Sequence, residues 1–508
     1  MEVELELSKE RKVRGMLMYT LEQANVYIES NSDQLNSKYR NDYHLMAPIG
    51  WINDPNGFIY YKGEYHLFYQ YYPYKAEWGP MHWGHAKSKD LVNWETVPVA
   101  LAPDQSYDKD GCFSGTAIEK DGKMYLMYTG HIEGETPEDI RQVQCMAVSS
   151  DGVNFEKVAQ NPVITEDSLP ENAKPQDFRD PKIIQKGDVY YSLIASRAKD
   201  GGGQILLYQS TDLLDWKFVS VLIEGEKDNF QMWECPDLFE LGGKDVLIVS
   251  VEGLPKKENN YPNTHSVISI LGEMDWDQGI FHKEKVEELD YGLDFYAPQT
   301  IADNKNRRIM VSWMQMWGRN IPTESHGWAG SMTIPRELTI KNNHIYQKPV
   351  AEIKNYYTNK QSYKNITLSD ETRAFDKLTG EVCALELVLD TKNGKQFEVE
   401  IRSNDNEKTL LSYNCVTGLL ELNRKKSGIE LTGNEKEHVY KRFVFCELTN
   451  YELKLEILLD RASIEVFVND GEYSLTSTIY PTKKADKIKF IAQGEIEIIN
   501  VAKWDIEI

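Results

Sequence analysis

Short hydrophobic stretches separated by turn residues dominate the chain from Gly50 onward. The segment 57–69 (GFIYYKGEYHLFY) has the pattern of a strand, a glycine-containing turn and a second strand, which is typical of a β-hairpin. Four further segments share this pattern, and the five starts lie roughly 60 residues apart, the spacing of a repeat architecture. The five predicted hairpins cover residues 57–69, 115–128, 181–195, 237–251 and 298–313.

A second motif recurs after the first three hairpins. It begins with Ser, has Asp two positions later and ends on an aromatic residue, at 88–94, 149–155 and 210–216. We interpret it as a turn with an aromatic anchor that leads into an outer strand. Five units of about four strands each predict a five-bladed β-propeller. A β-sandwich with unrelated hairpins is the alternative.

The two ends of the chain have different patterns. Leu21, Ala24, Ile28 and Leu35 lie near helical spacing and predict one amphipathic helix that packs on the next domain. After about residue 338 the repeat stops, and strict alternation around 453–468 predicts an antiparallel β-sandwich. We therefore predict an all-β protein with three parts: an N-terminal helical extension (1–40), a propeller (41–345) and a C-terminal sandwich (346–508).

Composition narrows the classes of function. The 508-residue chain has 57 basic and 80 acidic residues, and its net charge of −23 argues against nucleic acid or an anionic membrane as a partner. The first 40 residues lack the apolar segment of a signal peptide, so we expect a cytoplasmic protein. Six cysteines occur singly without a CxxC pair, which predicts reduced thiols and neither a metal site nor a disulfide framework.

Three predicted blades begin with an acidic residue close to a proline: Asp54, Asp180 and Glu234. The first strand of each blade lines the channel of a propeller, so we expect these carboxylates to converge. Three close carboxylates cannot all be ionised cheaply, and at least one should have a raised pKa. A proton donor beside an ionised carboxylate is what glycoside cleavage requires. A calcium site is the main rival use of such acids, and an isolated Asp-Pro is usually a turn.

Residues around the three acids suit a sugar ligand. Aromatic side chains can stack on a sugar ring, and amide, hydroxyl and guanidinium groups can bind its hydroxyls. The aromatic candidates are Trp51, Trp78, Trp83, Phe113 and Trp233, and the polar candidates are Asn53, Gln70, Ser114 and Arg179.

These residues lie in segments that resemble glycoside hydrolase family 32, the group of invertases, inulinases and levanases. The resemblance covers the chain from His44 to its C-terminal end and implies a five-bladed propeller followed by a β-sandwich. It also implies catalysis without a metal or organic cofactor. The matching segments are 51–57 (WINDPNG), 83–91 (WGHAKSKDL), 113–115 (FSG), 178–181 (FRDP), 233–236 (WECP), 294–297 (DFYA), 327–330 (GWAG) and 461–471 (RASIEVFVNDG).

The resemblance also implies roles for individual residues. Asp54 is the expected nucleophile, Glu234 the acid/base and Asp180 the transition-state stabiliser. The expected substrate-binding residues are Trp51, Ile52, Asn53, Gln70, Trp78, Phe113, Ser114 and Arg179, with Trp313 as a pocket wall near the leaving group, and with Asp294 and Tyr296 as partners of the acid/base.

Retention of configuration requires two carboxyl groups about 5–5.5 Å apart, so we expect this separation between Asp54 and Glu234. We expect burial and the neighbouring acids to keep Glu234 protonated, and hydrogen bonds to keep Asp54 ionised. Cys235 is expected to pack beside the site and tune it.

Within the family, segments 108–115 and 327–338 are similar to those of intracellular sucrose-6-phosphate hydrolases. The predicted function is retaining hydrolysis of sucrose or sucrose 6-phosphate. An exo-fructanase acting on inulin or levan, a fructosyltransferase and a fructose-binding lectin are the alternatives, and a homodimer is the open alternative to a monomer. Candidates to bind the 6-phosphate are Lys87, His131, Arg319 and His326.

Overall fold

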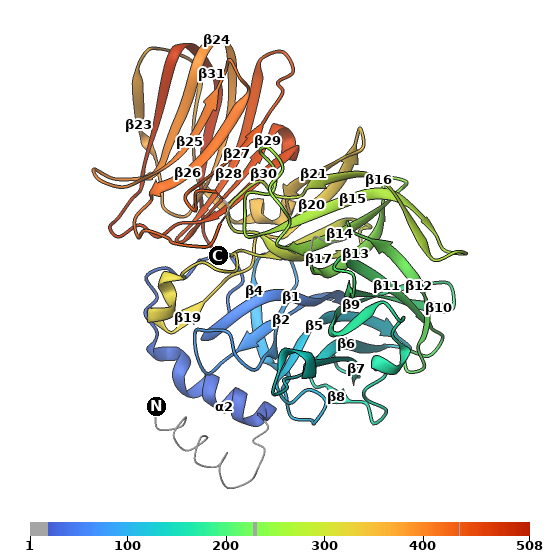
Figure 1. Cartoon of the computed structure of the whole chain (residues 1–508). Coiled ribbons are helices and arrows are strands. Elements are labelled where there is room, and N and C mark those ends of the chain that lie inside the picture. The colour runs from blue at the N-terminus through green and yellow to red at the C-terminus, as the bar shows by residue number, and fades with distance from the viewer. Residues whose placement is uncertain (1–18, 227–230, 436) are drawn as a thin grey trace.

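The described part of the chain folds into a five-bladed β-propeller and a C-terminal β domain, with one α-helix near the N-terminal side (Figure 1). This is the fold class that the sequence predicts. The computed structural model describes residues 19–226, 231–435 and 437–508.

Each blade is an antiparallel sheet of four main strands. The first strands of successive blades are neighbours, and β17 also contacts β1, so these five inner strands form a closed ring. Blade one contains β1 (Gly50–Tyr61), β2 (Glu64–Tyr72), β3 (His82–Ser88) and β4 (Trp94–Leu101). Blade two contains β5 (Gly111–Lys120), β6 (Lys123–Ile132), β7 (Arg141–Ser149) and β8 (Glu156–Lys157).

The other three blades repeat this order, and their first two strands are the predicted hairpins. A short strand between β18 and β20, β19 (Trp328–Ala329), pairs in parallel with β1 and joins the last blade to the first. Blade three contains β9 (Ala173–Lys186), β10 (Val189–Ala198), β11 (Gly203–Ser210) and β12 (Lys217–Glu224). Blade four contains β13 (Trp233–Leu241), β14 (Lys244–Glu252), β15 (His265–Asp275) and β16 (Ile280–Glu288). Blade five contains β17 (Tyr296–Ala302), β18 (Arg308–Trp313), β20 (Arg336–Lys341) and β21 (His344–Pro349).

The recurring Ser-x-Asp motif forms the turn before the outermost strand of the first three blades. In each turn the Asp side chain accepts two backbone N–H bonds, as Asp90, Asp151 and Asp212 all do. The indoles of Trp94 and Trp216 donate to backbone carbonyls within their own turns. These local bonds order the turns from the sequence alone, because Asp commonly caps its own turn in this way.

The N-terminal helix α2 (Leu21–Asn31) begins at a capping box, in which Thr20 and Gln23 bond each other's backbone N–H groups. Its fully buried Ala24 packs on blade one. The helix ends before Leu35, which is therefore not part of the predicted helical face. No described helix combines the length and apolar character needed to cross a bilayer. Short 3-10 helices occur at Ser32–Gln34, Pro137–Asp139, Glu166–Ser168, Pro322–His326, Ala351–Tyr356 and Asn469–Gly471.

The C-terminal domain is built on two long strands, β24 (Cys383–Ser403) and β31 (Lys487–Ile506), that pair with each other. The first half of β24 also pairs with β28 and its second half with β25, so these strands connect two layers around one apolar core. Its other strands are β22 (Tyr357–Ser369), β23 (Thr372–Thr379), β25 (Lys408–Asn414), β26 (Leu419–Lys426), β27 (Lys441–Phe445), β28 (Glu452–Asp460), β29 (Ser463–Val468) and β30 (Tyr473–Thr478).

Buried ionic contacts join the C-terminal domain to the propeller. The two ring nitrogens of His44 lie 2.8 Å from carboxylate oxygens of Asp460 and Glu465. Arg336 of β20 contacts Glu465 at 2.5 Å and Asp290 at 2.9 Å, and all these side chains are fully buried. This network fixes the orientation of the two domains.

Candidate active site

The inner strands of the propeller are irregular where the predicted site lies. On β9, β13 and β17, the ladder to the next strand gains an extra residue at Asp180, Cys235 and Ala297. All three residues have left-handed backbones, with φ of 61°, 47° and 52°. Such a conformation costs roughly 1–3 kcal/mol in a non-glycine residue and is concentrated at functional sites. These bulges turn side chains out of the normal alternation and toward the channel.

The three acids do not occupy equivalent positions of the repeat. Asp180 corresponds to Cys235, whereas Glu234 stands one position earlier on its strand. Asp54 lies in an additional bulge of β1, between Ile52 and Pro55. The resemblance of the blade starts in sequence is therefore only approximate, and the irregular backbone brings the side chains together.

The Cys235 thiol lies at the centre of the site. Its sulfur is 3.6 Å from Oδ2 of Asp54 and 3.6 Å from Oδ2 of Asp180, and its backbone N–H donates to the same Asp180 oxygen at 3.1 Å. Oδ2 of Asp54 and Oδ2 of Asp180 therefore lie within twice the 3.6 Å sulfur–oxygen distance of each other. Glu234 directly precedes Cys235 in the chain. Burial and the nearby acids raise the pKa of the Cys235 thiol well above its usual value, so the thiol stays neutral.

Asp54 is held by side chains from two blades. Asn53 Nδ2 donates to Oδ1 at 3.1 Å, and Ser114 Oγ donates to Oδ2 at 2.8 Å. These bonds favour the ionised form, as the sequence predicts. Burial and the charge of Glu234 outweigh them, however, and the pKa of Asp54 is raised above its usual value.

Glu234 has a donor on each carboxylate oxygen. Arg179 directs Nε and Nη2 at Oε1, at 3.0 and 2.8 Å, and the hydroxyl of Tyr296 lies 2.7 Å from Oε2. Oε1 is fully engaged by two N–H groups. Oε2 accepts the hydroxyl of Tyr296, so Tyr296 has the expected position of a partner of the acid/base.

Asp180 has a strongly perturbed carboxyl. Burial, together with the charges of Glu234 and Asp54, raises the pKa of Asp180 to about 7, although Arg179 opposes the shift. The expectation that crowding raises at least one pKa in this group is met here and at Asp54. The site therefore holds exchangeable protons near neutral pH.

The predicted sugar-binding side chains surround these acids in part. The Trp51 indole donates to Asn53 at 2.8 Å, which orients the amide that contacts Asp54. Phe113 stacks on His131, with ring centroids 4.1 Å apart. Trp78 contacts the edge of Phe113 and is 46% exposed, so it offers a free aromatic face at the mouth of the site.

Four predicted site residues are buried or held by other groups. Ile52 is buried in the apolar core of blade one, and Gln70 is buried and donates to the Cys112 carbonyl at 3.0 Å. Trp313 is fully buried behind Trp51 and therefore does not form a pocket wall. The fourth residue, Asp294, lies at the interface between the two domains.

Asp294 is a residue of the domain interface and not a partner of the acid/base. Its carboxylate contacts Arg319 and, at 2.5 Å, Arg424 of the C-terminal domain, and it accepts the Thr478 backbone N–H at 2.7 Å. Burial alone would raise the pKa of Asp294, but the two arginines outweigh burial and lower it. The short distance in sequence between Asp294 and Tyr296 is misleading, because the two side chains serve different regions.

The residues considered for a 6-phosphate are all engaged. Lys87 contacts Glu64 at 3.3 Å on the outer part of blade one, and Arg319 is fully buried in the domain interface. His326 stacks on Tyr39, with centroids 5.6 Å apart. His131 is covered by Phe113 and lies 3.0 Å from Glu133.

Two acidic residues near Arg179 are absent from the predicted site. Asp177 contacts Arg179 at 3.2 Å, and Glu252 contacts it at 3.9 Å. The charge of Glu234, followed by burial, raises the pKa of Glu252 to about 7. Hairpin register could have identified Glu252, because Ser250 pairs with Glu234 and side chains two residues apart share a face.

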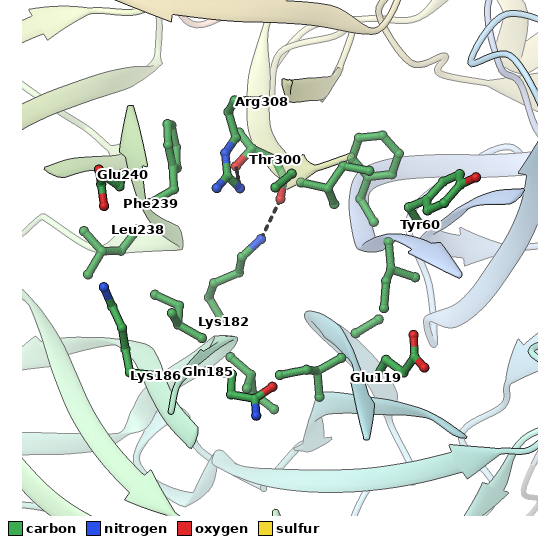
Figure 2. Close-up of a pocket in the computed structure, with 18 of the residues that line it drawn as sticks. Tyr60, Glu119, Lys182, Gln185, Lys186, Leu238, Phe239, Glu240, Thr300 and Arg308 are labelled. Carbon is green, nitrogen blue, oxygen red and sulfur yellow. Dashed lines mark hydrogen bonds between the residues drawn. The ribbon is translucent and has the colours of Figure 1, made fainter. Parts of the chain in front are cut away.

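A separate cavity of about 400 Å³ lies farther along the inner strands (Figure 2). Lys182 donates to the Thr300 carbonyl at 2.9 Å, and the Arg308 guanidinium lies 4.5 Å from the centroid of Phe239. None of the three acids lines this cavity, so it is distinct from the candidate active site. Among the described residues, no group of three or more acidic, His or Cys side chains has the arrangement of a metal site.

Comparison with known proteins agrees with this geometry. The model of the glycosyl hydrolases family 32 N-terminal domain matches residues 44–349, and that of the family 32 C-terminal domain matches residues 352–505. A sucrose-6-phosphate hydrolase from Zymomonas mobilis is 40% identical over 499 residues, covering 93% of each chain. A raffinose invertase from Escherichia coli is 38% identical, covering 91% of this chain and 94% of its own.

A solved structure extends the similarity to the fold. The GH32 β-fructofuranosidase of Bombyx mori, in complex with sucrose, has a TM-score of 0.83 at 34% identity, covering 96% of this chain and 98% of that chain. Both domain models and the relatives match along almost the whole chain. The protein therefore belongs to glycosyl hydrolase family 32 and is a glycoside hydrolase of the β-fructofuranosidase type.

Proposed function

We propose that the protein hydrolyses the terminal β-fructofuranosyl bond of sucrose or sucrose 6-phosphate with retention of configuration. The observation that carries the proposal is the convergence of Asp54, Asp180 and Glu234 around Cys235 at the inner strands. The names of the relatives support the substrate class, since they include a sucrose-6-phosphate hydrolase, a raffinose invertase and a sucrose complex.

Asp54 is the proposed nucleophile. Its carboxylate attacks the anomeric carbon of the fructosyl unit, while Glu234 gives a proton to the departing glycosidic oxygen. The product of this first step is a fructosyl ester on Asp54 and a free sugar. Asn53 and Ser114 hold the attacking carboxylate, which lowers the entropic cost of reaching the transition state.

Glu234 reverses its role in the second step. It takes a proton from water, the water oxygen attacks the anomeric carbon, and Asp54 departs as a carboxylate. Asp180 is proposed to stabilise the transition state through hydrogen bonds to fructose hydroxyls. Because the pKa of Asp180 is about 7, its carboxyl group can donate a hydrogen bond when protonated and accept one when ionised.

The proposal is tested by following sucrose cleavage by NMR before the products mutarotate. Retention predicts β-fructofuranose as the first product anomer, together with glucose in equal amount. An α anomer as the first product would contradict Asp54 as nucleophile, and intact sucrose would contradict the proposed activity. Oligosaccharides at high sucrose concentration would indicate a fructosyltransferase, and faster cleavage of inulin or levan an exo-fructanase.

A further inference from the structure

The charges beside Glu234 bear on the choice between sucrose and sucrose 6-phosphate, an inference that rests on the proposed function. Because Glu234 gives its proton to the leaving oxygen, the departing sugar lies on the Glu234 side of the site. The phosphate of sucrose 6-phosphate belongs to that departing sugar. Its electrostatic surroundings are therefore those of Glu234 and Arg179.

Arg179 and the nearby Arg197 are both occupied by carboxylates. Arg179 contacts Glu234 at 2.8 Å, Asp177 at 3.2 Å and Glu252 at 3.9 Å. Arg197 contacts Asp177 at 2.5 Å. Two guanidinium groups thus face three carboxylates before the charges of the other catalytic acids are counted.

Among the described residues beside Glu234, a phosphate that reached Arg179 or Arg197 would have to displace one of these carboxylates. Phosphate monoesters carry about −1.5 to −2 charges at pH 7 and are bound by arginine or lysine. Releasing Asp177 or Glu234 from its arginine would leave a poorly hydrated carboxylate unpaired, which is strongly unfavourable. The cations considered from sequence, including Lys87 and Arg319, are engaged in other regions.

Glu252 faces the solvent at this position. It ends strand β14, its side chain is 42% exposed, and one of its carboxylate oxygens lies 3.9 Å from Arg179. The carboxylate of Glu252 therefore repels an anionic sugar that approaches Glu234. An uncharged sugar can instead use this carboxylate as a hydrogen-bond acceptor.

We propose that the enzyme prefers an uncharged leaving group, and that Glu252 is a specificity-determining residue that disfavours phosphorylated sugar. The preference is electrostatic and therefore depends on salt. Raising the ionic strength screens the repulsion at this exposed group and improves the use of the anionic substrate only.

The first experiment compares kcat/KM of the full-length wild-type enzyme for sucrose and for sucrose 6-phosphate. We expect sucrose to be favoured by about tenfold or more, with the ratio falling as NaCl rises from 20 to about 500 mM. An equal or higher value for sucrose 6-phosphate would overturn the inference alone. Cleavage of neither sugar would overturn the proposed function and this inference with it.

The second experiment tests the residue. At pH 8, above the pKa of about 7 of Glu252, Glu252→Gln removes one negative charge with little change of shape, and the ratio of the two kcat/KM values should fall several-fold toward one. Glu284→Gln is the matched control, because Glu284 forms an exposed pair with Lys244 on the outer strand of the same blade. The control should keep the wild-type ratio. An unchanged ratio in Glu252→Gln would remove Glu252 from the explanation.

Discussion

Two groups of buried acids in this protein have opposite electrostatic settings. The channel cluster (Asp54, Asp180 and Glu234) has one arginine, Arg179, in contact with a single one of its carboxylates. In the interface cluster (Asp290, Asp294 and Glu465), every carboxylate has an arginine within 2.9 Å. Both clusters join parts of the chain that are distant in sequence.

The pKa values show the consequence of this difference. Burial and mutual repulsion raise the pKa of Asp54 and Asp180, whereas Arg336 and His44 overcome burial and lower the pKa of Glu465. A balanced set of charges holds two domains together, and an unbalanced set keeps protons available for chemistry. Buried acids therefore indicate catalysis when their counter-charges are too few.

The largest expected effect is on turnover, from Asp54→Asn. This variant keeps the shape of the side chain but removes the proposed nucleophile, and kcat on sucrose should fall by about 10⁴-fold or more. Thermal stability should be unchanged or higher, because the substitution also removes repulsion from Glu234. Steady-state kinetics and the melting temperature test both parts. Near-normal turnover would exclude Asp54 as nucleophile. A large loss of stability would contradict the conclusion that the channel cluster has too few counter-charges.

The second effect is on stability, from Asp294→Asn in the interface cluster. Removing this carboxylate leaves Arg424 buried without a carboxylate partner and Arg319 with Glu435 alone, and the free energy of unfolding should fall by about 3–5 kcal/mol. Urea denaturation measures the loss. Glu284→Gln breaks an exposed pair and should cost at most about 1 kcal/mol. If kcat of the folded Asp294→Asn enzyme fell as far as in Asp54→Asn, the assignment of catalysis to the channel cluster and of domain contact to the interface cluster would be wrong.

The third effect is on the pH dependence of stability. Burial lowers the pKa of His44, but Asp460 and Glu465 outweigh burial and raise it from 6.5 to about 9. The folded state therefore binds a proton more tightly than the unfolded state. The resulting stabilisation is complete below about pH 6.5 and is lost as pH rises to about 9. A shift of this size corresponds to about 3 kcal/mol.

The variant His44→Gln isolates this contribution. Unfolding midpoints measured between pH 6 and pH 10 should decline less steeply in the variant than in the wild type. Parallel curves would show that the imidazolium charge does not connect the domains.

Local signals explain what the sequence could predict. Glycine turns, Asp-capped turns and alternating strands are set by neighbouring residues, and they gave the five blades and the C-terminal β domain. The acids close to prolines predicted the channel cluster, because the inner strands of a propeller surround one central channel. Cytoplasmic location and the homodimer stay predictions.

Contacts between distant residues explain the errors. Asp294 stands just before the inner strand β17, near the position that the catalytic acids have in their own strands, and Arg424, 130 positions later, makes it an interface residue. Trp313 has an aromatic side chain of the kind that lines sugar pockets, but it is fully buried against Trp51. The hairpin register of β13 and β14 could have identified Glu252, but its contact with Arg179 on another blade could not be predicted from the sequence. Spacing along the chain does not contain these partners.

The smallest expected effect sharpens the comparison within the channel cluster itself. Tyr296 supplies the uncharged donor to Glu234, and Tyr296→Phe removes that one hydrogen bond while keeping the ring. A hydrogen bond to a charged group contributes about 1.5–3 kcal/mol, so kcat should fall by about 10- to 100-fold. Because the phenol stabilises the ionised carboxylate, its loss should also move the alkaline limb of kcat/KM to higher pH. Tyr208→Phe is the control, since its hydroxyl donates to the Ser168 carbonyl in blade three, and it should leave the pH profile unchanged. A Tyr296→Phe enzyme with reduced kcat but an unshifted profile would assign Tyr296 to packing alone.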